Sequence, residues 1–386
     1  MLFNPMTIGL VGCGQITEVH RDGYLRFGLP VVAGTDLSPE ARTKFAGQEP
    51  QARVYDTLDE LLADPAIEVL DVAAPHRADI RRPLLEKIVQ AGKPVLLQKP
   101  FAHYYADALA YCELFEKAGV PLMINQNSVF CGGVVELTKA IVHDGELGAL
   151  FTGRVSNTWD LDPGDHPWYG KGDRWWLTDM AVHELALLHH FMGAPVSVSA
   201  ASGRDAAQRG VEGDGFFHIL LRYADGASML VDESGAYYGP DRPDFMIELQ
   251  GEKGQVAFDP GKRAVVSRRQ AGASPQTEEV TSPYRWFPEA FGLVMQHFQY
   301  ALQTGQTPLC SAADNLHVMA VVEAAYLSAQ TGETVQLKSI MGERFVAGRP
   351  GALTGPADWL APPPVDGVKL KRDYAWATYT PTKAKA

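Results

Sequence analysis

Residues 7–20, TIGLVGCGQITEVH, decide the fold, because an apolar strand-like run passes directly into two closely spaced glycines and then into a helical pattern. Gly12 permits the tight turn, and Gly14 lets the backbone approach a bound diphosphate. The N–H groups of the helix that opens with Gln15 and Ile16 would meet the charge of that diphosphate. The pattern predicts the strand, turn and helix of a dinucleotide-binding unit.

An acidic residue stands where such a unit needs one. Asp36 ends the second apolar run, 22 residues after Gly14, and a carboxylate about 20 residues on can accept hydrogen bonds from the adenosine ribose. Its charge would repel a 2′-phosphate, so we expect NAD, with NADP as the alternative. Thr17 replaces the third glycine, which predicts a wider spacing between helix and sheet. The competing interpretation is a plain strand-to-helix turn, with Asp36 capping the next helix.

Outward from this unit, short apolar runs alternate with amphipathic segments as far as about residue 125. This rhythm predicts a Rossmann-type, doubly wound parallel sheet. After about residue 151, runs of alternating polarity are joined by Gly and Asp turns, which predicts an open, mainly antiparallel sheet with helices behind it. We therefore expect an α/β fold with an NAD(P)-binding domain (1–125), a substrate-binding, catalytic and oligomerisation domain (126–348) and an extended C-terminal arm (349–386).

The composition excludes several classes of protein. The 386 residues are 46% hydrophobic, and 46 acidic against 34 basic residues give a formal charge of −12. Such a charge repels nucleic acids and anionic membranes, so neither is an expected partner. The four cysteines show neither a CxxC pair nor metal-ligand spacing, and the N-terminus lacks the basic start of a signal peptide. We expect a soluble, cytoplasmic protein.

Two further segments carry candidate catalytic residues. Lys99, within Gln98-Lys99-Pro100, follows the apolar run Val95–Leu97, and carboxyl ends of parallel strands face the ligand crevice. Asp179 and His183 are spaced i, i+4 on an expected helix and would share one face. The competing interpretation is a surface cation, a helix cap and a histidine without catalytic function.

These segments resemble the Gfo/Idh/MocA family of NAD(P)-dependent oxidoreductases, over roughly the first 335 residues. The resemblance lies in the glycine turn followed by His20, in Gln98-Lys99-Pro100, and in Asp179 with His183. It lies also in Val72-Ala73-Ala74-Pro75 followed by Ala91-Gly92-Lys93-Pro94-Val95, which resembles the family's fourth-strand region. The family acts mainly on sugars, inositols and related polyols, and most of its members are dimers or tetramers. The resemblance thus implies a homodimer or homotetramer, which we expect to form through the C-terminal sheet.

The resemblance also implies residue roles. Lys99 and His183 would flank the reacting carbon, with His183 as the general base and Lys99 stabilising the developing alkoxide. Asp179 would hold substrate hydroxyls or orient the imidazole. Further candidate cofactor contacts are Ala74, Pro75, His76, Gln98 and Lys99 itself.

Three departures from the family pattern make assignment of the substrate by analogy unsafe. Gln98 replaces a glutamate, which should lower the pKa of Lys99 relative to that of a relative with the acid. His76 stands where many relatives have Asn, and 125–130 lacks an arginine that many carry.

An aromatic and acidic stretch over 159–176 suggests a sugar or glycoside substrate, because indole rings stack on sugar faces while carboxylates and Arg bind hydroxyls. The candidate substrate contacts are Asn127, Trp159, Asp160, Arg174 and Trp176. The tryptophans fit equally well as core or interface anchors. A calcium loop starting at Asp160 would place Lys171 where an acid is required, and zinc-ligand spacing is absent, so we predict no metal.

Three functions compete at this point. The first is a dehydrogenase acting on a sugar, glycoside or polyol. The second is a glycoside hydrolase or lyase that recycles its NAD, oxidising the sugar transiently so that an acidified C–H bond allows elimination. The third is a non-catalytic protein that responds to NAD.

Overall fold

The computed structural model describes residues 4–138, 141, 144–159, 170–204, 210–235, 245–259, 263–282 and 284–348. It divides into two compact units. Among the described residues, the first unit holds 4–130 and 285–316, and the second holds 131–282, 284 and 317–348 with the gaps given above. The expected division at residue 125 assigns segment 285–316 to the second domain. In the structure this segment lies in the first unit. The expected arm over 349–386 lies outside the described residues.

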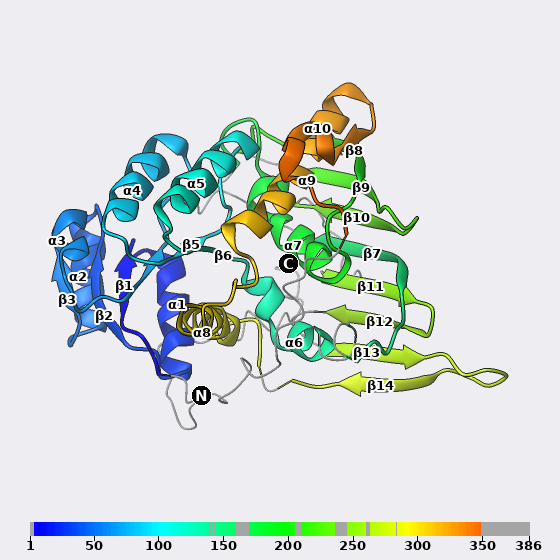
Figure 1. The fold of residues 1–386 in the computed structure, drawn as a ribbon, viewed down its shortest axis with the longest axis horizontal. Coiled ribbons are helices and arrows are strands. Elements are labelled where there is room, and N and C mark those ends of the chain that lie inside the picture. The colour runs from blue at the N-terminus through cyan, green and yellow to red at the C-terminus, as the bar shows by residue number, and fades with distance from the viewer. Residues whose placement is uncertain are drawn as a thin grey trace, which may run out of the picture. The chain divides into compact units, whose positions relative to one another are not determined.

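The first unit is built on a parallel sheet of order β3-β2-β1-β4-β5-β6 (Figure 1). Its inner strands are short apolar runs, and β1, β4, β5 and β6 are buried along their whole length, as parallel strands covered on both faces must be. The predicted Rossmann-type sheet is confirmed. The strands are β1 (Ile8–Val11), β2 (Val31–Thr35), β3 (Arg53–Tyr55), β4 (Val69–Val72), β5 (Val95–Gln98) and β6 (Leu122–Asn125).

Local sequence determines where the helices of this unit begin and end. Thr57 and Glu60 form a capping box at the start of α3, and Gly119, with φ +66°, ends α5 as a left-handed cap. α8 packs against α1, and Gly23 of α1 faces Gly292 of α8 so closely that a Cβ on either would meet the other's backbone below 3 Å. The helices are α1 (Gln15–Arg26), α2 (Pro39–Gln48), α3 (Leu58–Leu62), α4 (Ala78–Gln90), α5 (Tyr105–Ala118), the 3₁₀ turn η1 (Asn127–Phe130) and α8 (Glu289–Thr304).

The second unit is built on a sheet of order β14-β13-β12-β11-β7-β10-β9-β8-β15. All its neighbours are antiparallel except β7 and β10, which are parallel, so the expected mainly antiparallel sheet is confirmed. Burial alternates along β9, β10 and β11, so this sheet has one covered and one open face. The strands are β7 (Leu150–Thr158), β8 (Ser197–Gly203), β9 (Phe216–Arg222), β10 (Ser228–Ser234), β11 (Phe245–Gly251), β12 (Gly254–Asp259), β13 (Arg263–Arg268), β14 (Gln276–Val280) and β15 (Val335–Gln336).

The helices that belong wholly to the second unit are mostly short. α7 is buried along its whole length and carries His183. The boundary between the units falls within α9, between Leu316 and His317. The helical elements are α6 (Gly132–Thr138), the π-helical turn η4 (Trp176–Met180), α7 (Val182–Met192), α9 (Ala312–Thr331), α10 (Leu337–Met341) and the 3₁₀ turn η5 (Gly342–Arg344).

Candidate active site

The glycine turn after β1 packs closely against the chain at Gly12 and leaves the start of α1 open at Gly14. Gly12 has φ +95°, and a Cβ placed on it would lie 2.9 Å from the carbonyl oxygen of Ala73. Gly14, the N-cap of α1, is exposed and faces open space, and it has no side chain with which to cap the helix. The exposed Gln15 and half-buried Ile16 follow. The first N–H groups of α1 are therefore presented beside an open approach, as binding of a diphosphate requires.

Asp36 ties the end of β2 to this turn. Its Oδ2 accepts a hydrogen bond from the Cys13 amide at 2.7 Å, and its Oδ1 accepts one from the Ser38 amide at 2.8 Å. The alternative role of a helix cap falls to Ser38, whose hydroxyl accepts from the Ala41 amide at the start of α2. Burial, then Asp36, raises the pKa of the Cys13 thiol to about 12, so the turn carries no thiolate to repel an anion.

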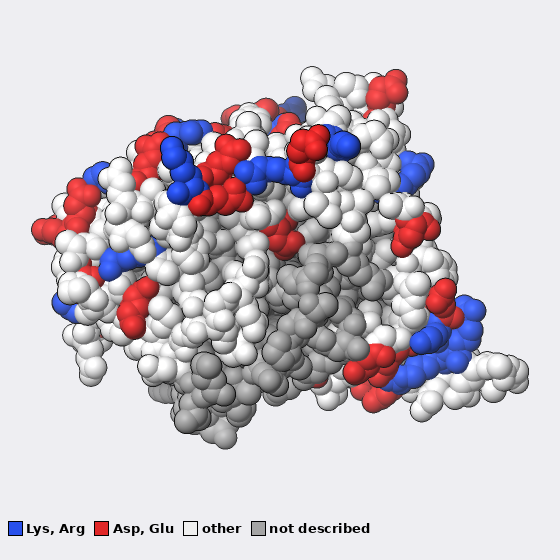
Figure 2. Space-filling model, in the orientation of Figure 1, with Lys and Arg blue, Asp and Glu red and all other residues white. Residues whose placement is uncertain are grey.

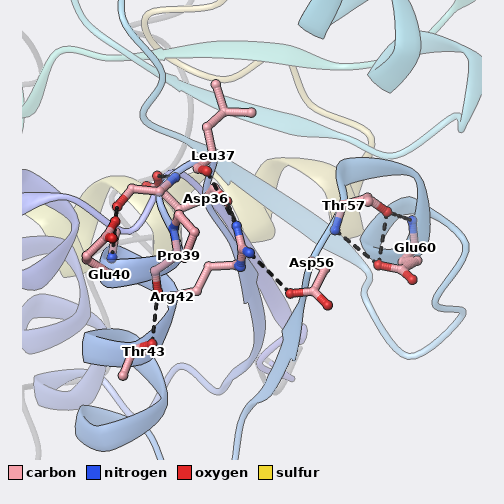
Figure 3. A network of polar contacts seen from close by, with 11 residues as sticks. Asp36, Leu37, Pro39, Glu40, Arg42, Thr43, Asp56, Thr57 and Glu60 are labelled. Carbon is pink, nitrogen blue, oxygen red and sulfur yellow. Dashed lines mark hydrogen bonds and ion pairs between the residues drawn. The ribbon is translucent and has the colours of Figure 1, made fainter.

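Arg42 of α2 holds the chain just after Asp36. Its guanidinium donates to the carbonyl oxygen of Asp36 at 2.7 Å and pairs with the Asp56 carboxylate at 3.2 Å (Figure 3). Leu37 lies between these contacts and is 93% exposed. Arg42 thus holds the backbone at Asp36, while the side chain of the next residue, Leu37, stays exposed.

The carboxyl ends of β4 and β5 carry the other first-unit candidates. Gln98, the last residue of β5, is buried, and Lys99 follows it half-buried. The imidazole of His76 stacks on that of His103 with 5.6 Å between the ring centroids. Burial, then the charges of Arg81, His103 and Lys99, lowers the pKa of His76 to about 3. His76 is therefore a neutral group at the end of β4, after Ala74 and Pro75.

Arg81 joins these two strand ends, and the sequence patterns did not single it out. Its fully buried guanidinium donates to the carbonyl oxygens of Ala74 at 2.7 Å, of Phe101 at 2.9 Å and of Pro100. It thereby links the segment before His76 to the segment after Lys99. The available signal was the i, i+4, i+7 pattern of Arg81, Leu85 and Ile88, the buried residues of α4, which places a charge on the apolar face.

The second-unit candidates lie at the junction of η4 and α7. The Asp179 amide donates to the Trp175 carbonyl at 2.8 Å, and the Ala181 amide donates to the Trp176 carbonyl, five residues back, at 3.0 Å. The spacing of Asp179 and His183 therefore crosses from a π-helical turn into a regular helix. Their exposed fractions are 8% and 9%, so both are shielded from bulk water. π-Helical turns of this kind recur at functional sites.

The candidate substrate contacts are engaged within their own units. Trp176 is fully buried, and its indole donates to Glu233 Oε2 at 3.2 Å. Arg174 binds Glu323 through two hydrogen bonds of 2.7 and 2.8 Å. The half-buried Trp159 donates to Asn157 Oδ1.

Two further candidates complete the set. In the first unit, the buried Asn127 accepts from Trp286 at 3.3 Å. Asp160 lies outside the described residues.

Trp159 and Trp176 are linked by hydrogen bonds to a pair of buried acids, Glu184 and Glu233. Glu184, next to His183, accepts from Asn157 at 2.8 Å, and Asn157 is paired in register with Glu233 across β7 and β10. Burial, then the charge of Glu184, raises the pKa of Glu233 well above its usual range. Burial beside a second acid thus favours the protonated form of the Glu233 carboxyl.

Among the described residues, no group of three or more His, Cys, Asp or Glu side chains has the arrangement of a metal site. The four cysteines are buried thiols. On the face drawn in Figure 2, basic side chains lie beside acidic ones. Arg82 of α4 forms an ion pair with Asp107 of α5 at 2.9 Å. In the part of the chain that the structure describes, no helix is both long and apolar enough to cross a membrane.

Comparison with known proteins identifies relatives of both units. Residues 6–126 match the NAD-binding Rossmann fold of the Gfo/Idh/MocA oxidoreductase family, and residues 139–337 match its C-terminal α/β domain. D-apiose dehydrogenase of Paraburkholderia graminis is 30% identical over 345 residues, which cover 86% of this chain and 90% of that protein. D-apiose dehydrogenase of Rhizobium rhizogenes is 29% identical over 343 residues, with coverage of 86% and 97%.

Solved structures show the same fold. An oxidoreductase from Agrobacterium radiobacter, in complex with NAD+, L-tartaric acid and magnesium, is 26% identical and superposes with a TM-score of 0.78 over 87% of this chain and 100% of its own. Levoglucosan dehydrogenase, in complex with NADH and levoglucosan, is 20% identical with a TM-score of 0.76 over 86% of this chain and 100% of its own.

Proposed function

Because this chain belongs to the Gfo/Idh/MocA family of oxidoreductases, we propose that it transfers a hydride between NAD and a hydroxyl-bearing carbon of a sugar, glycoside or polyol. The observation that carries the proposal is the match to D-apiose dehydrogenase along 86% of the chain. The ranges matched by the family include Lys99, Asp179 and His183.

The residues of the first unit fit NAD. A Cβ on Gly12 would press against the carbonyl oxygen of Ala73, and the space around Gly14, at the start of α1, is open. Residues 12–16 would therefore hold the diphosphate. Asp36, anchored beside the turn, would accept hydrogen bonds from the adenosine ribose. Ala74, Pro75, His76 and Gln98, at or after the carboxyl ends of β4 and β5, would complete the site. When bound, NAD supplies the acceptor for the hydride.

Three side chains would handle the proton and the charge. His183 takes the hydroxyl proton as the hydride leaves, because an imidazole has an ordinary pKa near 6.5 and titrates around neutral pH. Lys99 donates a hydrogen bond to the developing alkoxide, which stabilises charge absent from the ground state. Asp179 holds a substrate hydroxyl or orients the imidazole. This scheme requires Lys99 of the first unit and His183 of the second to meet at one carbon.

The substrate class is the finer part of the proposal. The relatives that are 30% and 29% identical are named for D-apiose, a sugar. The half-buried Trp159 would stack on a sugar ring. Trp176 and Arg174, which are bound to Glu233 and Glu323, would support the site without touching the sugar. A five-carbon sugar is therefore the first substrate class to examine.

The test is a screen of purified protein against pentoses, hexoses, polyols and aryl glycosides, with NAD and then NADP. A dehydrogenase accumulates reduced nicotinamide in proportion to the substrate consumed, and His183→Ala abolishes it. Release of an aglycone without net reduction would instead indicate the glycoside hydrolase or lyase. Tighter binding of NADP than of NAD would contradict the role given to Asp36.

We further propose that two copies associate through the open face of the second-unit sheet. Leu230, in the middle of β10, is 54% exposed there, beside Leu220 of β9 in register. In the proposed assembly, these two leucines near the centre of the nine-stranded sheet would lie under the second copy.

A further inference from the structure

The π-helical turn η4 (Trp176–Met180) is held at its start by an acid from elsewhere in the second unit. Asp214 lies between Gly213 and Gly215, just before β9, and is 8% exposed. Its Oδ1 accepts from the Trp175 amide at 2.8 Å, and its Oδ2 accepts from the Leu177 amide at 3.0 Å. A carboxylate that binds two N–H groups at the start of a helical turn acts as an N-cap supplied from a distance.

Tyr326 of α9 completes this arrangement. Its hydroxyl donates to Asp214 Oδ1 at 2.6 Å and accepts from Thr178 Oγ1 at 3.3 Å. Burial, then Asp214, raises the pKa of Tyr326 well above its usual value, so the hydroxyl keeps the proton that it donates. A chain of hydrogen bonds therefore runs from Thr178, directly before Asp179, through Tyr326 to Asp214.

The groups around Tyr326 leave it little freedom. The Arg174 guanidinium lies 4.4 Å from the centre of its ring and is itself bound to Glu323, one turn earlier on α9. Phe217 packs against the Tyr326 ring in an edge-on arrangement, with 5.1 Å between the ring centroids. The backbone of Gly213 lies against that of 173–174, where a Cβ would come within 3.1 Å of the Arg174 nitrogen.

We propose that Asp214 and Tyr326 are positioning residues, which set the turn η4 and thereby the placement of Asp179 and His183 for proton transfer. Neither residue is assigned contact with the substrate. A π-helical turn, in which the Ala181 amide bonds to the Trp176 carbonyl five residues back, is less regular than an α-helix and needs such external contacts to keep one geometry. The inference rests on the proposed function, because it is the proton transfer that makes the placement matter.

The decisive variant is Tyr326→Phe, which removes the hydroxyl and keeps the ring that contacts Arg174 and Phe217. Its matched control is Tyr223→Phe in the same unit, since the buried Tyr223 hydroxyl has no hydrogen-bond partner among the residues that the structure describes. Three quantities are measured: kcat with NAD and the best substrate, the Kd of NAD alone, and hydrogen exchange of the peptide covering 174–180 by mass spectrometry.

In Tyr326→Phe we expect kcat to fall about tenfold, because small displacements of catalytic groups have effects of this size or larger. The Kd of NAD should stay unchanged, and the 174–180 peptide should exchange faster. Tyr223→Phe should change none of the three. Wild-type exchange in Tyr326→Phe, or an equal loss of kcat in both variants, would overturn the inference.

Two provisions keep the test decisive. If Tyr326→Phe does not fold, Thr178→Val removes the neighbouring hydrogen bond and is judged by the same criteria. If none of the substrates screened supports reduction of NAD by the wild type, the proposed function fails. Exchange of the 174–180 peptide then decides by itself whether Asp214 and Tyr326 hold the turn, and unchanged exchange overturns that as well.

Discussion

Arg81 is a single residue on which two parts of the first-unit site depend. Replacing it with Met leaves the carbonyls of Ala74, Pro100 and Phe101 without their charged donor. Unsatisfied buried carbonyls are costly, so Arg81→Met should lower the free energy of unfolding by about 3 kcal/mol. Urea denaturation followed by tryptophan fluorescence measures the change.

Arg82 is the matched control for this prediction. It is the next residue of α4, its side chain is 46% exposed, and it pairs with Asp107 at 2.9 Å. Arg82→Met should cost less than about 1 kcal/mol, as exposed ion pairs do. Equal losses in the two variants would mean that Arg81 has no special role.

Glu233 predicts how stability depends on pH. Because its pKa is raised in the folded state above the ordinary 4.5, the folded protein keeps a proton that the unfolded chain releases. Stability from this group is full below pH 4.5 and is lost as the pH rises above it. Glu233→Gln carries no charge at any pH, so its Tm relative to wild type should rise from pH 5 to pH 8.

Differential scanning calorimetry at several pH values tests this prediction. The control is Glu248→Gln on β11, because Glu248 is exposed in the same sheet. The Tm difference from wild type should rise more steeply with pH for Glu233→Gln than for Glu248→Gln. An equal pH dependence in the two variants would contradict the raised pKa of Glu233.

These residues show what could and could not be predicted at this scale. Lys99, Asp179 and His183 belong to motifs, so the sequence singles them out, and their catalytic roles stay predictions. Arg81 and Asp214 act on backbone groups distant in sequence, and no local spacing of residues reports such contacts. Their roles follow only from tertiary structure.

Among the elements, the glycine turn makes the sharpest prediction. Gly14→Ala meets open space at an ordinary φ of −75°, so the apo protein should keep its Tm. The methyl group would obstruct the diphosphate at the start of α1, and NAD binding should weaken roughly tenfold, which corresponds to one charged hydrogen bond. Isothermal titration calorimetry measures the Kd.

Substitutions at two other glycines serve as a comparison and a control for Gly14→Ala. Gly12→Ala should lower both NAD affinity and stability, the latter by at least about 1–2 kcal/mol, because its φ is positive and Ala73 leaves no room. Gly47→Ala, in α2 with open space around it, should leave NAD affinity unchanged. NAD affinity in Gly14→Ala equal to wild type would remove the turn from the cofactor site.

Element type could be predicted wherever burial and hydrophobic pattern agree. The expected alternation of apolar runs and amphipathic segments corresponds to strands β1, β2, β4, β5 and β6 and to helices α1 to α5. The strands β3, β7, β8, β14 and β15 were not predicted. β3 and β14 are edge strands whose side chains are mostly exposed, so they carry no apolar alternation. Pairing with β2 holds β3 in place, and pairing with β13 holds β14.

At the scale of the whole molecule, the sequence predicted an NAD-binding Rossmann domain and a second α/β domain, and both are confirmed. It did not predict that 285–316 return to the first unit, where α8 packs on α1 through facing glycines. Close helix packing between segments more than 250 residues apart leaves no periodic trace in either segment. That Lys99 and His183 act on one carbon stays a prediction, and the loss of turnover expected in His183→Ala tests the role given to the histidine.

The open sheet face makes the last prediction, on assembly. If a second copy covers Leu230, then Leu230→Arg places a charge in the middle of that interface, and a buried unpaired charge is costly. The variant should run as a monomer of 42.1 kDa in light scattering coupled to size-exclusion chromatography, while wild type runs at twice that mass or more. Leu327→Arg is the control, because Leu327 is 41% exposed but lies on α9. A monomeric wild type, or monomers from both variants, would contradict assembly through this face.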